Sequence, residues 1–129
     1  MANQVHTLNA EIRDDKLLRT YPYGGIAGRG RGTDVMFIAK QPTYWEARKG
    51  FAFAGETGQF VLQHMKRKGF KVNQIYVTYM IKLFARSRKP SRKVLDLSLE
   101  YLEKELELVK PRLIVALGMD VMRAFDVKG

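Results

Sequence analysis

The chain contains no cysteine among its 129 residues. It therefore has no disulfide, no thiolate zinc site and no iron–sulfur cluster held by cysteine, and its redox compartment stays undetermined. Long apolar runs are missing too, as is an apolar segment near the N-terminus. The two histidines, His6 and His64, lie in separate predicted elements without carboxylates at ligand spacing. We expect a soluble cytoplasmic protein without membrane contact, metal or other cofactor.

Acidic residues are few relative to basic ones. Lys and Arg total 23 against 13 Asp and Glu, which gives a net charge of +10. The stretch "KLFARSRKPSRK", residues 82–93, holds six basic residues and no acid, and a second basic group spans residues 66–71. Such segregation is typical of a surface that binds a polyanion, either DNA or RNA. The alternatives are a solvated basic surface without a partner and an anionic membrane surface, which the lack of an amphipathic helical stripe disfavours.

Hydrophobic residues make up 46% of the chain, which argues against disorder and for one domain over residues 1–129. The predicted strands cover residues 34–39, 75–81 and 112–118, and the predicted helices cover residues 7–20, 56–68, 91–109 and a segment from 119. This alternation predicts a three-layer α/β/α fold with a central parallel sheet covered on both faces. We expect residues 1–33 to form an N-terminal helix and a Gly/Arg-rich loop, and residues 34–129 to form the α/β core. The functional site is expected at the carboxyl ends of the strands.

The glycine-rich stretch "GIAGRGRG", residues 25–32, invites comparison with a phosphate-binding loop. It precedes the first strand, however, and lacks the order of strand, glycine-rich turn and helix that lets backbone amides converge on a phosphate. We expect instead a mobile loop in which Arg29 and Arg31 contact a nucleic-acid backbone.

The stretches "DVMFIAKQPTYWE" and "GFAFAGETGQFV" resemble the first motif region of the uracil-DNA glycosylase superfamily, particularly its thermostable family 4 branch. There a strand runs into a Gly-Glu-Ala-Pro-Gly loop, and a Pro-Phe-Val-Gly segment about ten residues later begins a helix. The positions that match in spacing are Pro42, Glu46, Gly50, Phe53, Gly55 and Gly58. With "QIYVTYMIKLFARSRKPS" and "YLEKELELVKPRLIVALG", which look like later elements of that branch, the resemblance covers about residues 24–125. It implies that branch's fold and DNA as a partner.

The sequence departs from the family 4 pattern at functional positions. Lys40 stands where that branch has an acid, and Thr43 replaces the second glycine of its loop. Tyr79 takes the place of the asparagine that reads the uracil edge. Two cluster cysteines would fall at Leu83 and Ser98, and the His-Pro-Ser motif does not occur in the sequence. The resemblance therefore implies a site without an iron–sulfur cluster.

The resemblance also assigns roles to the loop after the first strand. Residues 40–46, with Pro42 and Tyr44, would form the lip of a base-binding pocket. Phe53 would be the floor on which an extruded base stacks, partly exposed in a cleft beside Gln41 and Tyr79. Tyr79 is too large to substitute for asparagine and is expected to fill the pocket.

Two residues of this loop are candidates for chemistry. Gln41 could position a water molecule but cannot act as a base at neutral pH. Lys40 could stabilise developing negative charge or, as an alternative, serve as an amine nucleophile. The residues expected to contact the DNA backbone are Arg29, Arg31, Lys82, Arg86, Arg88, Lys89, Arg92 and Lys93.

Two function hypotheses follow from the sequence. The first is a DNA-binding member of the superfamily with a degenerate active site, an accessory protein of replication or repair that also has a protein partner there. The second is an active, divergent DNA glycosylase that hydrolyses the N-glycosidic bond of uracil or another damaged base. The first is favoured, because the missing asparagine and histidine motif would supply specificity and anion stabilisation. Both imply DNA, single- or double-stranded, as the partner.

Overall fold

The protein is an α/β domain in a computed structural model that describes residues 2–31, 34–86 and 89–125. The helices are α1 (Ala2–Asp14), α2 (Tyr44–Lys49), α3 (Glu56–Arg67), α4 (Arg92–Val109) and α5 (Met119–Phe125), with 3-10 turns η1 (Leu18–Thr20) and η2 (Val72–Gln74). The strands are β1 (Arg29–Gly30), β2 (Val35–Ala39), β3 (Ile75–Tyr79) and β4 (Leu113–Leu117). The predicted α/β class is confirmed, but two segments predicted as loop form β1 and α2.

The four strands form one sheet in the order β1-β3-β2-β4. The central strand β2 runs parallel to both β3 and β4, whereas β1 pairs antiparallel with β3. In register, Ala39 pairs with Tyr79, so β2 and β3 end at the same edge. The amides of Met80 and Ile81 then donate to the carbonyl oxygens of Ala39 and Lys40. The loops that follow β2 and β3 therefore begin side by side, where parallel sheets commonly carry their sites.

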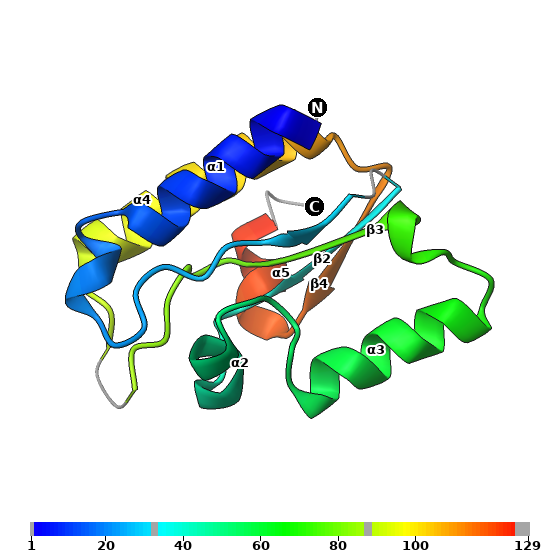
Figure 1. Cartoon of the computed structure of the whole chain (residues 1–129), viewed down its shortest axis with the longest axis horizontal. Coiled ribbons are helices and arrows are strands. Elements are labelled where there is room, and N and C mark those ends of the chain that lie inside the picture. The colour runs from blue at the N-terminus through cyan, green and yellow to red at the C-terminus, as the bar shows by residue number, and fades with distance from the viewer. Residues whose placement is uncertain (1, 32–33, 87–88, 126–129) are drawn as a thin grey trace.

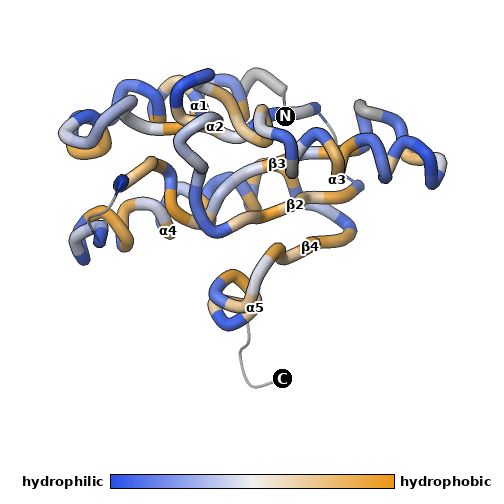
Figure 2. The backbone as a smooth tube through the Cα atoms, turned by 90° about the horizontal axis from the view of Figure 1, so that it is seen from below, coloured by the Kyte–Doolittle hydropathy of each residue, from blue (hydrophilic) through white to orange (hydrophobic). Residues whose placement is uncertain are grey.

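Helices cover the two faces of the central strands. α1 and α4 lie side by side along one face (Figure 1) and share a core that includes Leu8, Ile12 and Val94. On the other face, Phe37 and Val77 pack with Phe53 and with residues from α2 and α3. The backbone coloured by hydropathy shows the apolar residues concentrated along β2, β3 and β4 (Figure 2). Among the described residues, no helix is long and apolar enough to cross a membrane.

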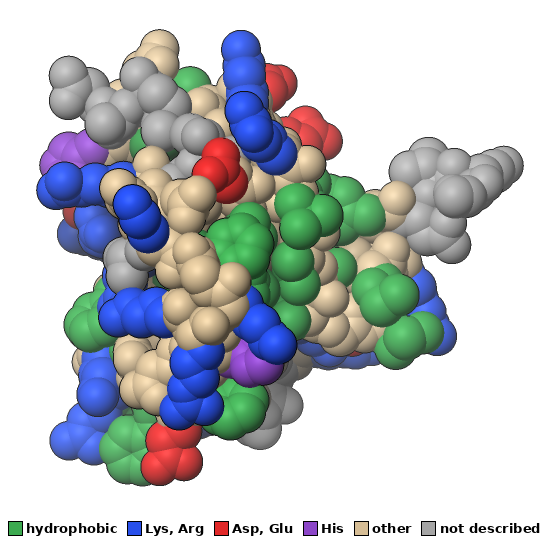
Figure 3. Space-filling view, turned by 90° about the vertical axis from the view of Figure 1, so that its right-hand side faces the viewer, with side chains coloured by type: hydrophobic (Ala, Val, Ile, Leu, Met, Phe, Trp, Pro, Cys, Tyr) green, Lys and Arg blue, Asp and Glu red, His purple; other side chains and the backbone are tan. Residues whose placement is uncertain are grey.

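The outer side of β4 is less covered than a parallel sheet usually is. Leu113 is 55% exposed, and Met119 and Met122 on the adjacent α5 are exposed as well. Hydrophobic side chains gather on the right-hand part of the face in Figure 3, apart from most of the Lys and Arg side chains. No strand within the described ranges pairs with the outer edge of β4. The expectation of a sheet covered on both faces therefore holds for β2 and β3 but is wrong for β4.

Candidate nucleic-acid interface

The loop after β2 carries Lys40, one of the two candidates for chemistry. Its ammonium lies 2.9 Å from the Asp120 carboxylate on α5, and both side chains are about half exposed. The hydrogen bond and charge of Lys40 hold the pKa of the Asp120 carboxyl below its usual value. Asp120 balances the charge of Lys40, which weakens any role of this amine in stabilising an anion. Gln41, the other candidate, is half-buried beside it, and its role stays a prediction.

Thr43 begins helix α2 at the point where the family 4 loop has a glycine. Its hydroxyl accepts the amide N–H of Glu46 at 3.3 Å, and the Thr43 amide donates to Glu46 Oε1 at 3.0 Å. This reciprocal pair is a capping box, which satisfies amide donors that a helix N-terminus leaves unpaired. The predicted pocket lip is therefore part loop and part helix, with Pro42 buried and Tyr44 half-buried.

Phe53 is buried, with 3% of its surface exposed. Its amide donates to the Tyr79 hydroxyl at 2.9 Å, and the two rings lie 5.8 Å apart. Burial raises the pKa of Tyr79, so the phenol stays protonated and neutral. The prediction of a partly exposed stacking floor is wrong. Tyr79 and the apolar side chains packed on this face of the sheet, among them Phe37 and Val77, enclose the Phe53 ring.

The backbone at Phe53 adopts an uncommon conformation. Its φ of 58° lies in the left-handed region, which costs energy for a residue with a side chain. Gly58 makes this turn feasible, because a Cβ there would lie only 2.6 Å from the Phe53 carbonyl oxygen. The spacing of Phe53 and Gly58 thus serves a tight turn into α3.

Most of the predicted backbone-contacting residues that the structure describes are accessible. Arg31, Arg86, Lys89, Arg92 and Lys93 are exposed. Arg92 forms an exposed ion pair with Asp96 at 3.2 Å, which leaves it available to other anions. Arg88 lies outside the described residues.

Arg29 is more restrained than the other arginines. It is half-buried, and its guanidinium stands 4.9 Å from the centroid of the Phe51 ring. It also lies on β1, which pairs with β3. The mobile loop expected at this position is therefore wrong for Arg29, which the strand and the ring hold in place.

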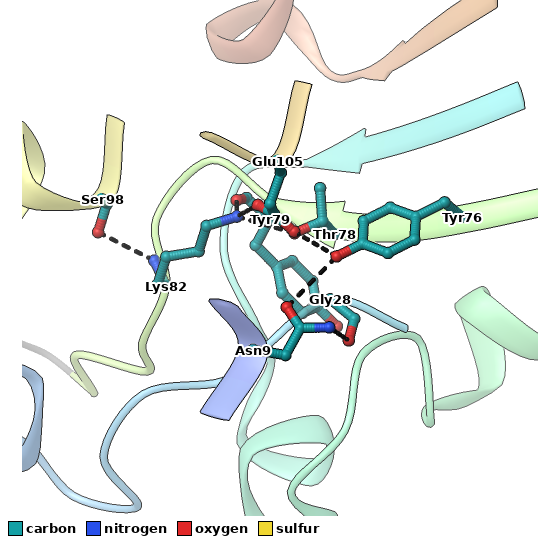
Figure 4. Close-up of polar contacts among 8 residues, drawn as sticks. All are labelled: Asn9, Gly28, Tyr76, Thr78, Tyr79, Lys82, Ser98 and Glu105. Carbon is teal, nitrogen blue, oxygen red and sulfur yellow. Dashed lines mark hydrogen bonds and ion pairs between the residues drawn. The ribbon is translucent and has the colours of Figure 1, made fainter. Parts of the chain in front are cut away.

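Lys82 is fully buried and cannot contact a phosphate. Its ammonium binds the Glu105 carboxylate, the Tyr79 carbonyl oxygen and, at 2.8 Å, the Thr78 hydroxyl (Figure 4). These three acceptors match the three protons of an ammonium. Burial lowers the pKa of Lys82, and the Glu105 charge opposes that shift. The assignment of Lys82 to the DNA backbone is wrong, because the side chain turns inward to pair with α4.

The same buried network reaches two further elements. Glu105 accepts from the Tyr76 hydroxyl at 2.7 Å, and that hydroxyl also lies 3.4 Å from Asn9 Oδ1 (Figure 4). The Asn9 side-chain amide donates to the Gly28 carbonyl oxygen at 3.2 Å. A Cβ at Gly28 would stand 2.3 Å from the Tyr76 hydroxyl, so only glycine lets this segment approach the network. Gly28 thus serves close packing, and the network joins α1, β3 and α4.

A groove between α2 and α3 was not foreseen from the sequence. It has a volume of about 910 Å³, and its lining includes Trp45, Phe60, Gln59 and Gln63. Trp45 is 59% exposed and Phe60 69% exposed, which is unusual for such large apolar side chains. The only signal in the sequence is the single tryptophan of the chain, placed in the motif loop.

The positions that resemble cluster cysteines do not fit an iron–sulfur cluster. Leu83 is buried in the apolar core under α1 and α4. Ser98 is buried as well, and its hydroxyl accepts the Lys82 amide at 3.1 Å. Neither side chain offers a thiolate, and the chain has no cysteine. Within the described ranges, no group of three His, Asp or Glu side chains is arranged to hold a metal ion.

Comparison with known proteins connects this site to one family. The sequence model of the uracil DNA glycosylase superfamily matches residues 27–127. One similar protein is the Type-4 uracil-DNA glycosylase of Pyrobaculum aerophilum, which is 29% identical over 79% of this chain and 53% of the relative. Another is the Type-4 uracil-DNA glycosylase of Sulfurisphaera tokodaii, which is 23% identical over 90% of this chain and 55% of the relative. That of Archaeoglobus fulgidus is 27% identical over 66% of this chain and 43% of the relative. The chain thus spans about half the length of these relatives.

Proposed function

The chain belongs to the uracil-DNA glycosylase superfamily, and on that premise we propose that it binds DNA through a basic surface while Tyr79 closes its base pocket. In this proposal the protein is an accessory factor of replication or repair and not an enzyme that excises bases. The observation that carries the proposal is the contact between Tyr79 and Phe53.

The Tyr79–Phe53 contact supports a pocket that accepts no base. A glycosylase must take the target base out of the stack and hold it in a pocket that reads its edge. Here the ring of Tyr79 lies against Phe53, and its hydroxyl accepts a hydrogen bond from the Phe53 amide. An unpaired base would have to displace a buried ring and break that hydrogen bond.

The chemical groups around this position support the same proposal. The reaction needs a donor or charge aimed at the anion that develops on the departing base. Lys40 shares its charge with the half-exposed Asp120 carboxylate, and Gln41 offers an amide that cannot act as a base. The acid of the family 4 loop is replaced by lysine. A nucleic-acid-binding role requires none of these groups.

The exposed basic residues after β3 support DNA as the partner. Arg86 and Lys89 extend from a loop that begins at the same sheet edge as Lys40. The net charge of +10 favours binding to a polyanion. Contacts of this type act on phosphates, so they give affinity with little sequence preference.

The double variant Arg86→Gln and Lys89→Gln tests the proposal. Each phosphate contact contributes about 0.7 to the slope of log affinity against log salt for single-stranded DNA, so the variant is expected to flatten that slope by about 1.4. Affinity at low salt falls as well. Fluorescence anisotropy of a labelled oligonucleotide at several salt concentrations measures both quantities.

A charge-matched control separates direct contacts from net charge. Lys104→Gln with Lys110→Gln removes the same charge from exposed positions within and at the end of α4. This control is expected to keep the wild-type salt slope. If both double variants bind alike, or if the wild type binds neither single- nor double-stranded DNA, the proposal fails.

A second candidate function is an active, divergent glycosylase. The left-handed backbone at Phe53 favours it, because strained residues of this kind gather at functional sites. In that case Tyr79 would have to move away to admit a base. Excision of uracil by the unmodified protein decides between the two functions.

A further inference from the structure

We propose that the groove between α2 and α3 binds unpaired bases of single-stranded DNA by stacking them on Trp45 and Phe60. This inference rests on the proposed DNA-binding function and adds to it the form of DNA and the residues that hold the bases. The groove is separate from the closed position at Phe53, whose ring is buried.

The groove has the size of a ligand site and carries two large aromatic rings among mainly polar side chains. Its volume of about 910 Å³ falls within the usual range for small-molecule sites. Trp45 and Lys49 line it from α2, and Gln59 and Phe60 line it from α3. The two helices lie on the same side of the sheet, joined by residues 50–55 (Figure 1). One large aromatic ring therefore comes from each side of the groove.

The exposed Trp45 ring is held in place by its neighbours. The Trp45 ring packs edge-on against Tyr44 at 5.1 Å, and Tyr44 in turn packs against Phe84 at 6.0 Å. A ring fixed in this way loses little conformational entropy on binding. Every base has a π-face, so such rings accept bases without regard to sequence.

The charges around the groove suit a base inside and phosphates outside. The Arg48 guanidinium stands 5.9 Å from the centroid of the Trp45 ring, and Lys49 lines the groove itself. The acids of the lining are Glu46, which the capping box engages, and Glu56. An acid there disfavours a phosphate within the groove. A neutral base avoids that repulsion, and its phosphates can reach the cations.

The chain has one tryptophan, so its fluorescence reports on this groove alone. Titration with a thymidine oligonucleotide of about 15 nucleotides, near the upper site size of single-strand binders, is expected to quench Trp45. Phe60→Ala is expected to weaken binding about 5- to 150-fold, the range for loss of one stacked base. Because Phe60 is 69% exposed, this change leaves folding intact, which circular dichroism verifies.

Two controls isolate stacking from backbone contacts. Leu99→Ala removes an exposed apolar side chain on α4, remote from the groove, and should bind as the wild type does. An oligonucleotide of the same length without bases should bind weakly and leave Trp45 fluorescence unchanged.

The outcomes distinguish this inference from the proposed function. Salt-dependent DNA binding with unchanged Trp45 fluorescence and no effect of Phe60→Ala would contradict base binding in the groove. The proposed function would then still stand. Tighter binding of the matching RNA would overturn the assignment to DNA. Binding of neither single- nor double-stranded DNA would contradict both the proposed function and base binding in the groove.

Discussion

Lys82→Met is expected to lower the free energy of unfolding by about 3–5 kcal/mol, the usual cost of removing one partner from a buried ion pair. Lys82 and Glu105 are both fully enclosed, and the ammonium also binds Thr78 and the Tyr79 carbonyl oxygen. Methionine fills a similar volume, so the loss comes from the Glu105 charge that stays buried without its cation. Urea unfolding followed by circular dichroism measures the change.

Arg92→Met provides the control for this prediction. Its ion pair with Asp96 is exposed to solvent, so its loss is expected to cost less than about 1 kcal/mol. Combining Lys82→Met with Glu105→Leu removes both charges and is expected to recover much of the loss. If Lys82→Met unfolds at the same urea concentration as Arg92→Met, the network does not stabilise the fold as described.

Tyr79→Asn is expected to open a cavity beside Phe53 that binds free uracil. Removal of a buried aromatic ring costs about 3–5 kcal/mol, so the variant should also be much less stable. The new amide can pair with the edge of a pyrimidine, and Phe53 can stack on its face. Uracil at 100 times its dissociation constant would raise the free energy of unfolding of the variant by about 2.7 kcal/mol, a shift that thermal unfolding detects.

Tyr79→Phe is the matched control for the cavity. It keeps the ring and removes only the hydroxyl that accepts the Phe53 amide, so it should cost about 1–3 kcal/mol and bind no uracil. If uracil stabilises the wild type or Tyr79→Phe as strongly as Tyr79→Asn, then Tyr79 does not close the pocket.

Apolar periodicity was sufficient to predict the parallel core. β2 and β3 read as continuous apolar runs because both faces of these strands are buried, and their predicted bounds differ from the structure by no more than two residues. α4 shows buried residues at helical spacing, including Val94, Leu102 and Val109. Leu99 is apolar but exposed, because it lies beside the packed face of the helix.

The roles of single polar and aromatic residues depended on tertiary contacts that periodicity does not contain. Lys82 belongs to a basic run in the sequence, yet its side chain turns inward to Glu105. The burial of Glu105 could have been predicted from the sequence. It stands three residues after Leu102 and four before Val109, on the buried stripe of α4. An acid at such a position indicates a buried partner.

The site region shows the same division between local and long-range information. Thr43 and Glu46 have the spacing of a capping box, so α2 could have been predicted from the sequence. The burial of Phe53 could not, because it depends on Tyr79, which lies 26 residues away and reaches it across the sheet edge. The groove lined by Trp45 and Phe60 likewise requires two helices to be placed together.

Incubation of the unmodified protein with uracil-containing single- and double-stranded oligonucleotides, with binding measured in the same samples, tests the central claim most directly. The closed contact between Tyr79 and Phe53 predicts that the DNA is bound and every uracil stays in place. Release of uracil by the protein would contradict the claim. Loss of that release in Gln41→Ala or Lys40→Ala would then identify the residue that carries the chemistry.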